Sequence, residues 1–108
     1  MSPPRTPFVL VASLWVRDGR VAEFEAYERK AARIMRRYGG AIERAIRIDP
    51  ANASPDAPFE VHVVTFPDRA RFDAYRADSE LAGLAAEREA AIGKTLVLTG
   101  TDTAAYVS

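Results

Sequence analysis

The chain has 108 residues, of which 48% are hydrophobic and 28% charged, and its 15 Lys+Arg residues balance 15 Asp+Glu residues. This size and balance predict one folded domain and leave no room for a second. Because cysteine is absent, disulfides, thiolate metal sites and a cysteine nucleophile are excluded. Zero net charge argues against binding to nucleic acid or to an anionic membrane, and we expect a cytoplasmic protein.

The N-terminal part predicts a tail, a strand and a helix. Three prolines make residues 1–7 a flexible tail. Residues 8–17 are rich in Val and Leu and predict a buried strand, which is far short of the ~20 residues of a membrane span. Residues 19–38 carry apolar side chains at intervals of three and four, as in an amphipathic helix. Asp18 is its expected N-cap, and Gly39-Gly40 ends it.

The middle of the chain predicts two paired strands. Residues 41–49 alternate in polarity, with the three isoleucines on one face, and residues 59–66 form the next strand after a proline-rich loop over 50–58. The loop is too short for a crossover connection, so the two strands pair antiparallel. A loop centred on its middle residues gives two cross-strand pairs, Arg47 with Glu60 and Ala45 with His62.

The last third predicts more helix and a final strand. One helix starts at Pro67-Asp68, and Asp78-Ser79 caps a further helical segment; two short helices or one kinked helix both fit this pattern. Gly93 ends the helical segment, and residues 94–99 predict the last strand. A short tail follows over residues 102–108.

The element order is therefore β-α-β-β-α-β over residues 8–101. This is the α+β, ferredoxin-like arrangement of a four-stranded antiparallel sheet with helices on one face. The strand over 8–17 is apolar on both faces, so it needs cover on both faces. In a chain this short the second cover has to come from another copy, which predicts a homodimer packed sheet to sheet. A cavity beside the sheet, between the two sheets, is then the natural ligand site.

Several short motifs occur in an order that resembles a known family. They are Tyr38-Gly39-Gly40 at a helix end, Phe66-Pro67 at a strand end, the aromatic Tyr75, the spacing of Glu80 and Arg88, and the closing Gly100. On these motifs the chain, over residues 8–100, is similar to the family catalogued as domain of unknown function 1330. That family lies in the dimeric α/β-barrel superfamily that also contains antibiotic-biosynthesis monooxygenases.

The resemblance implies the ferredoxin-like fold and a homodimer, the dimeric α/β barrel, but it brings no catalytic residues with it. Members of the wider superfamily carry out cofactor-free oxygenation, haem breakdown, dehalogenation, lactone isomerisation and decarboxylation, and others are only structural; fold alone does not choose among these. The chain departs from the family at Thr65, where the family often has Glu. It departs again at residues 78–81, where Asp-Ser-Glu-Leu replaces a frequent Ser-Pro-Glu-Tyr. Any contribution of that Glu or Tyr to a family pocket is absent here.

His62, the only histidine, is the main candidate for acid-base chemistry. It would act as a general base on an acidic C–H or O–H, with Glu43 or Glu60 orienting its ring. The alternative is a packed or ion-paired histidine on a sheet. One histidine without cysteine does not make a zinc site, so we expect no metal.

Arg88 interrupts an apolar helix face, where an unpaired buried charge costs several kcal/mol. Its partner is either a substrate carboxylate or an internal one from Asp73 or Glu43, and an internal salt bridge would make its role structural. The predicted substrate-binding residues are Trp15, Ser13, Arg47, Tyr75 and Arg88. The aromatic members also fit a packed core, and Arg47 with Glu60 also fits a pair that fixes strand register.

These residues predict a small homodimeric protein that binds a small organic molecule between sheet and helices. His62 and Glu43 are the catalytic candidates of a cofactor-independent enzyme, such as an oxygenase or an isomerase. The alternative is a non-catalytic binding or structural dimer, in which His62 and Arg88 are satisfied internally. An RNA-binding module of the same element order is the weakest interpretation, because the aromatic strand motif and basic sheet are missing. The sequence has no phosphate-binding loop, nucleophile elbow or zinc motif, so we expect no cofactor.

Overall fold

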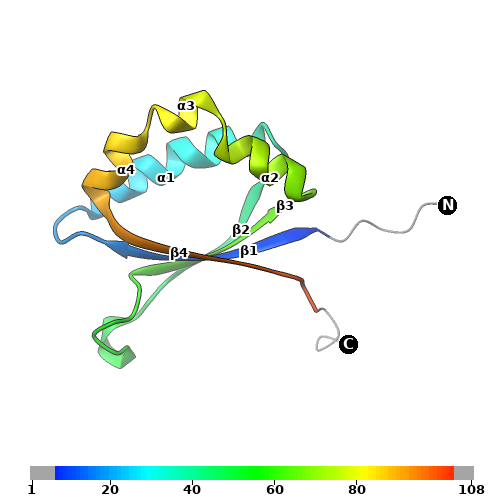
Figure 1. Cartoon of the computed structure of the whole chain (residues 1–108). Helices are drawn as coiled ribbons and strands as arrows, with labels where there is room; N and C mark the ends of the chain where they lie inside the picture. The colour runs from blue at the N-terminus through cyan, green and yellow to red at the C-terminus, as the bar shows by residue number, and fades with distance from the viewer. Residues whose placement is uncertain (1–6, 104–108) are drawn as a thin grey trace.

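Four strands form one antiparallel sheet in the order β2-β3-β1-β4, and the helices lie on one of its faces (Figure 1). The computed structural model describes residues 7–103. The elements are β1 (Phe8–Val16), α1 (Val21–Arg36), β2 (Ala41–Arg47), η1 (Pro50–Asn52), β3 (Glu60–Phe66), α2 (Arg69–Arg76), α3 (Ser79–Ala82), α4 (Ala85–Ala91) and β4 (Ile92–Gly100). The predicted α+β, ferredoxin-like fold is confirmed. Apart from Pro7, Asp102 and Thr103, the predicted tails lie outside the described residues.

The two faces of the sheet have different surroundings. Leu10 and Leu14 of β1 face the helices and are 3% and 4% exposed, whereas Val11 faces the other way and is 37% exposed. Exposed apolar side chains of three strands share this second face, called the outer face below: Val11, Ile46, Leu96 and Leu98. Both faces of β1 are therefore apolar, as predicted, and elements among the described residues cover only one of them (Figure 1).

β2 and β3 pair in the predicted register, which is confirmed for Arg47 opposite Glu60 and Ala45 opposite His62. A bulge between Ile42 and Arg44 then shifts the pairing. An extra residue reverses the alternation of side chains beyond it. Ile42 therefore lies opposite Val64 on the helix-facing side, while Ile46 lies on the outer face. The prediction that the isoleucines share one face is wrong for Ile42.

α1 buries one stripe of its surface against the sheet. The stripe follows the predicted spacing of three and four, and its members are Phe24, Tyr27, Ala31, Ile34 and Met35. Phe24 is 1% exposed, and burying such a side chain contributes about 1.5–3 kcal/mol. The N-cap is Arg20 and not the predicted Asp18. Gly19 has a φ of 73°, and Arg20 donates its N–H to the carbonyl of Arg17, so a turn separates Asp18 from the helix.

The second helical region breaks into the three short helices α2, α3 and α4. An aspartate begins each of the first two: Asp68 accepts a backbone N–H at the start of α2, and Asp78 accepts two at the start of α3. Tyr38 Oη donates to Asp78 at 2.5 Å and so links the end of α1 to α3. β4 begins one residue before Gly93, so this glycine lies within the strand and does not end the helix as predicted.

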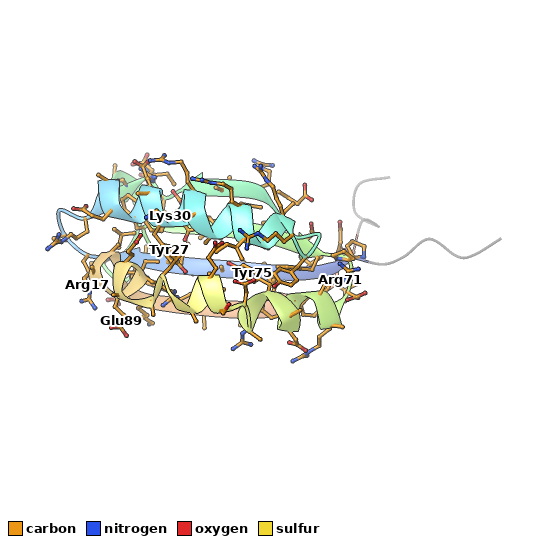
Figure 2. The ribbon with its side chains drawn as sticks, turned by 90° about the horizontal axis from the view of Figure 1, so that it is seen from above. Arg17, Tyr27, Lys30, Arg71, Tyr75 and Glu89 are labelled. Carbon is orange, nitrogen blue, oxygen red and sulfur yellow. The ribbon has the colours of Figure 1, made fainter. Side chains whose placement is uncertain are left out.

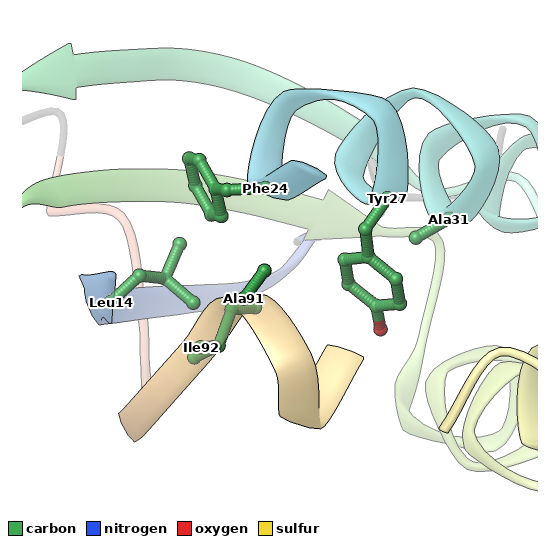
Figure 3. Packing of buried hydrophobic residues seen from close by; sticks show 6 residues of the cluster. All are labelled: Leu14, Phe24, Tyr27, Ala31, Ala91 and Ile92. Atoms are coloured by element: carbon green, nitrogen blue, oxygen red, sulfur yellow. The ribbon is translucent and has the colours of Figure 1, made fainter. Parts of the chain in front are cut away.

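Buried side chains form two clusters between the helices and the sheet. The cluster beside α4 consists of Leu14, Phe24, Tyr27, Ala31, Ala91 and Ile92 (Figure 3). The cluster beside α2 consists of Leu10, Met35, Val64, Phe66 and Phe72. The core is therefore divided along the length of the sheet.

The end of α1 packs directly on the end of β3. A Cβ added to Gly39 would lie 2.7 Å from Pro67 Cγ, and the φ of Gly39 is 75°, a left-handed conformation that favours glycine. A Cβ added to Gly40 would lie 2.5 Å from Met35 Cγ and from Phe66 Cε1. The Tyr-Gly-Gly and Phe-Pro motifs are thus the two sides of one contact.

We predict that Gly40→Ala lowers the free energy of unfolding by about 1–3 kcal/mol, because the added methyl group overpacks this contact. Gly100→Ala is the matched control, since an added Cβ there meets nothing within 4 Å. The control should change stability by less than about 0.5 kcal/mol. Urea denaturation measures both variants, and equal stability of the two would contradict the contact.

Candidate functional site

A cavity of about 570 Å³ opens between the sheet and the helices, next to both clusters. This volume is in the range of small-molecule sites. Much of its lining is apolar, and polar side chains from five elements enter it, among them Tyr27, Glu28, His62, Tyr75, Arg88 and Thr95. Seen from above, Tyr27 and Tyr75 lie between α1 and the row of shorter helices (Figure 2). The cavity thus gathers polar groups from distant parts of the chain.

His62 lies in the floor of the cavity and belongs to a row of three bonded side chains. The imidazole is 4% exposed, and its Nε2 lies 2.6 Å from Glu60 Oε2. Arg47 donates to Glu60 Oε1 through Nε at 3.0 Å and through Nη2 at 2.8 Å. The Arg47 guanidinium also stands 4.4 Å over the ring of Phe59. A guanidinium, a carboxylate and an imidazole therefore run from the β2 edge of the sheet toward the cavity.

Glu28, on α1, approaches the opposite side of the imidazole. Its Oε2 lies 3.9 Å from His62 Nδ1. Burial raises the pKa of Glu28, and the nearby His62 acts in the opposite direction with a smaller effect. Sequence reasoning missed this residue. Its spacing, four residues after Phe24 and three before Ala31, places it beside the buried stripe, and that is the signal that could have found it.

Arg88, on α4, reaches from the helix layer to the sheet. Its Nη2 donates to Thr95 Oγ1 of β4 at 2.5 Å. Among residues 7–103, no carboxylate lies within 4.0 Å of its guanidinium. The two internal partners suggested by the sequence are engaged elsewhere, Asp73 with Arg69 and Glu43 with Thr65. The internal salt bridge of the structural alternative is therefore not formed within this range.

Tyr27 and Tyr75 bring two phenol groups to the cavity. Burial raises the pKa of both hydroxyls, and at Tyr27 the neighbouring Arg88 works against this effect. Both tyrosines are therefore neutral O–H donors near pH 7. Tyr27 descends from α1 with its hydroxyl directed away from Phe24 (Figure 3).

The structure brings four of the predicted site residues together: His62, Tyr75 and Arg88 line the cavity, and Arg47 holds Glu60 behind His62. The other three lie apart from the cavity. Trp15 donates its indole N–H to the carbonyl of Asp56, Ser13 pairs with strand neighbours on the outer face, and Glu43 accepts a hydrogen bond from Thr65. Glu60, and not Glu43, is the carboxylate bonded to the imidazole. The cavity lies between helices and sheet, one of the two places expected from the sequence. A cavity between two sheets needs a second copy and stays a prediction.

The charges around the cavity are unequal. The arginine and glutamate side chains that line it are Arg69, Arg76, Arg88 and Glu28. Three arginines against one glutamate make the lining positive. Such a cavity can hold an apolar molecule by an anionic oxygen, and His62 and Glu28 can exchange a proton with it.

The ferredoxin-like α+β fold of this chain recurs in solved structures of several bacterial proteins. One is a protein of unknown function from Rhodopseudomonas palustris, with a TM-score of 0.77 and 16% identity over 92% of this chain and 84% of that chain. Another is a proposed antibiotic biosynthesis monooxygenase from Nitrosomonas europaea, with a TM-score of 0.69 and 10% identity over 95% of this chain and 96% of that chain. A nipsnap family protein of unknown function from Agrobacterium tumefaciens has a TM-score of 0.67 and 11% identity over 93% of this chain and 91% of that chain. At these identities the likeness shows the fold alone.

No protein-family model and no curated protein matches the sequence. Within residues 7–103, no group of three or more His, Cys, Asp or Glu side chains is placed to hold a metal ion. In the same range no helix is long and apolar enough to cross a membrane.

Arg47→Met is expected to lower the free energy of unfolding by about 1–3 kcal/mol, because it removes both donors from an oxygen of the buried Glu60. Methionine keeps much of the apolar contact with Phe59. Arg44→Met is the matched control, because Arg44 is exposed on the same strand. It should change stability by less than about 0.5 kcal/mol. Chemical denaturation measures the free energy of unfolding of both variants. An equal decrease in both would show that Arg47 does not stabilise Glu60.

Proposed function

We propose that this protein binds a small organic molecule with an apolar body and one anionic oxygen in the cavity between helices and sheet. The observation that carries the proposal is Arg88, a half-buried guanidinium that lines an apolar cavity with Thr95 as its hydrogen-bond partner. A cation in such surroundings is stabilised by a charge-assisted hydrogen bond to an anion. A ligand carboxylate, phenolate or enolate supplies that anion.

The proposed chemistry is proton transfer to or from the bound molecule. His62 is the acid-base group, since Glu60 fixes its ring by a hydrogen bond at Nε2 and leaves Nδ1 on the side of Glu28. Arg88 stabilises the negative charge that develops when the ligand loses a proton. The proposed monooxygenase among the structures with this fold supports an enzyme without supplying a reaction.

We also propose membership of the domain of unknown function 1330 family. The support is that its two short motifs meet in space: Gly39 lies against Pro67, and Gly40 lies against Phe66. Both glycines are thus explained by one contact between α1 and β3.

A specific observation favours a second candidate, a non-catalytic binding or structural protein. In the described part of the chain, every buried side-chain nitrogen and oxygen already has a hydrogen-bond partner. His62 is then a residue that is satisfied internally by Glu60. In this case the cavity can bind a ligand without acting on it.

The outer face supports a homodimer packed sheet to sheet. Leu96 and Leu98 are 45% and 57% exposed, and Val11 lies beside them on the neighbouring strand. An exposed apolar surface of this kind marks an interaction site. A second copy of the chain presents the same apolar surface, as a two-fold interface requires.

The ligand proposal predicts that Arg88→Met weakens binding of 1-anilinonaphthalene-8-sulfonate about tenfold, which corresponds to about 1.4 kcal/mol. This dye combines an apolar aromatic body with one anionic group, and its fluorescence in a titration reports the affinity. Its uncharged counterpart, N-phenyl-1-naphthylamine, should bind the variant and the unmodified protein equally well. This comparison assigns the loss of affinity for the anionic dye to the charge of Arg88.

Arg33→Met removes the same charge from the solvent-exposed side of α1 and should leave the affinity for both dyes unchanged. Equal weakening by Arg33→Met and Arg88→Met would contradict a specific anchor in the cavity. Unchanged binding of the anionic dye to Arg88→Met would contradict it as well.

The dimer proposal predicts that Leu98→Lys converts the protein to a monomer, because a charge on the outer face cannot be buried without a partner. Sedimentation velocity measures the change in mass. Ala82→Lys adds the same charge at an exposed position of α3 and should leave a dimer. A monomeric unmodified protein at high concentration would refute the proposal outright.

A further inference from the structure

We propose that Glu28 carries protons between the cavity and His62, at the inner end of a row that continues through Glu60 to Arg47. Only the part of this inference that concerns a bound molecule rests on the proposed function. The exchange of a proton between Glu28 and His62 is a property of the free protein and can be measured without a ligand.

The row is fixed from its outer end. Arg47 donates two N–H groups to Glu60 Oε1, at 3.0 and 2.8 Å, so Glu60 lies as a carboxylate against a guanidinium. Its second oxygen, Oε2, is then free to accept from His62 Nε2 at 2.6 Å. Nε2 is therefore the nitrogen of His62 that carries a proton.

This assignment determines the role of the other ring nitrogen. In a neutral imidazole with a proton on Nε2, Nδ1 is an acceptor. Glu28 Oε2 lies 3.9 Å from Nδ1, which is longer than a hydrogen bond, so the exchange requires the carboxyl group to approach the ring. While Glu28 is protonated, its O–H is the donor that Nδ1 needs, and burial raises the pKa of this carboxyl.

Charged groups on every side of Glu28 act on this proton. His62 and Arg88 favour the carboxylate, whereas burial and the negative charge of Glu60 favour the neutral acid. Tyr27, the preceding residue on α1, lines the same cavity. Tyr75, on α2, is close enough to Glu28 to interact with its charge. The net effect of all these groups is a raised pKa of Glu28.

The exchange permits chemistry at the cavity wall. When the O–H bond of Glu28 breaks and an N–H bond forms at Nδ1, the products are a carboxylate that lines the cavity and an imidazolium held by Glu60. The carboxylate can then take a proton from an acidic O–H or C–H of the ligand, and the ligand anion is stabilised by Arg88. Return of that proton to another atom of the ligand completes a proton shift, which needs no oxidant or reductant.

Nitrogen NMR of ¹⁵N-histidine-labelled protein tests the proposal directly, because His62 is the only histidine in the chain. Two coupled groups titrate in two macroscopic steps. In the unmodified protein, the Nδ1 shift should therefore change in two steps with pH, one of them stronger at Nδ1 than at Nε2. Glu28→Gln should lose that step, since an amide cannot exchange the proton.

Two further variants complete the experiment. Glu23→Gln removes the same charge from an exposed position of α1 and should keep both steps. Glu60→Gln should redistribute the ring proton between Nε2 and Nδ1, because the carboxylate that fixes it is gone. A single Nδ1 step in the unmodified protein, or an unchanged Nδ1 profile in Glu28→Gln, would overturn the proposal.

The result of the NMR titration is independent of the dye titrations. If the Nδ1 steps behave as expected while Arg88→Met leaves dye binding unchanged, the proton exchange stands and the ligand proposal fails. If Glu28→Gln does not fold, the step that is stronger at Nδ1 than at Nε2 in the unmodified protein still distinguishes coupling to Glu28 from coupling to Glu60, which is bonded at Nε2.

Discussion

The burial of Glu60 and His62 is the constraint on which the rest of the structure depends. These two side chains are 8% and 4% exposed and lie on the helix-facing side of the sheet. Enclosing a carboxylate without a partner would cost several kcal/mol, so Arg47 has to lie opposite Glu60. That requirement fixes the register of β2 on β3. His62, two residues after Glu60 on the same strand, faces the helices as well, and Glu28 approaches it there.

The cavity follows from the way in which the second helical region is divided. α2, α3 and α4 have 8, 4 and 7 residues, whereas α1 has 16. Short helices present separate apolar faces, because each new cap at Asp68 or Asp78 restarts the helix. Two clusters form instead of one continuous core, and the long side chain of Arg88 reaches Thr95 between helix and sheet.

The features that depend on periodicity could be predicted from the sequence. Alternation in β1, the stripe of α1 and the length of the loop after β2 were enough for the fold and for the pairing of Arg47 with Glu60. Features that depend on one extra residue or on distant contacts could not be predicted from the sequence. The bulge after Ile42 reverses one face, and the role of Glu28 is visible only because the fold brings it beside His62. Alternation along β1 also places Ser13 and Trp15 on the face opposite Leu10 and Leu14.

β4 belongs to both sides of the molecule. Side chains of β4 alternate between its two faces. Thr95 and Val97 line the cavity, and Leu96 and Leu98 lie on the outer face. A strand is nearly rigid across its own thickness, so a displacement of one row of side chains moves the other. The cavity and the outer face are thereby the two sides of one strand backbone. If the proposed ligand and the proposed second copy are coupled through this strand, thermodynamic reciprocity requires that each changes the affinity for the other by the same factor.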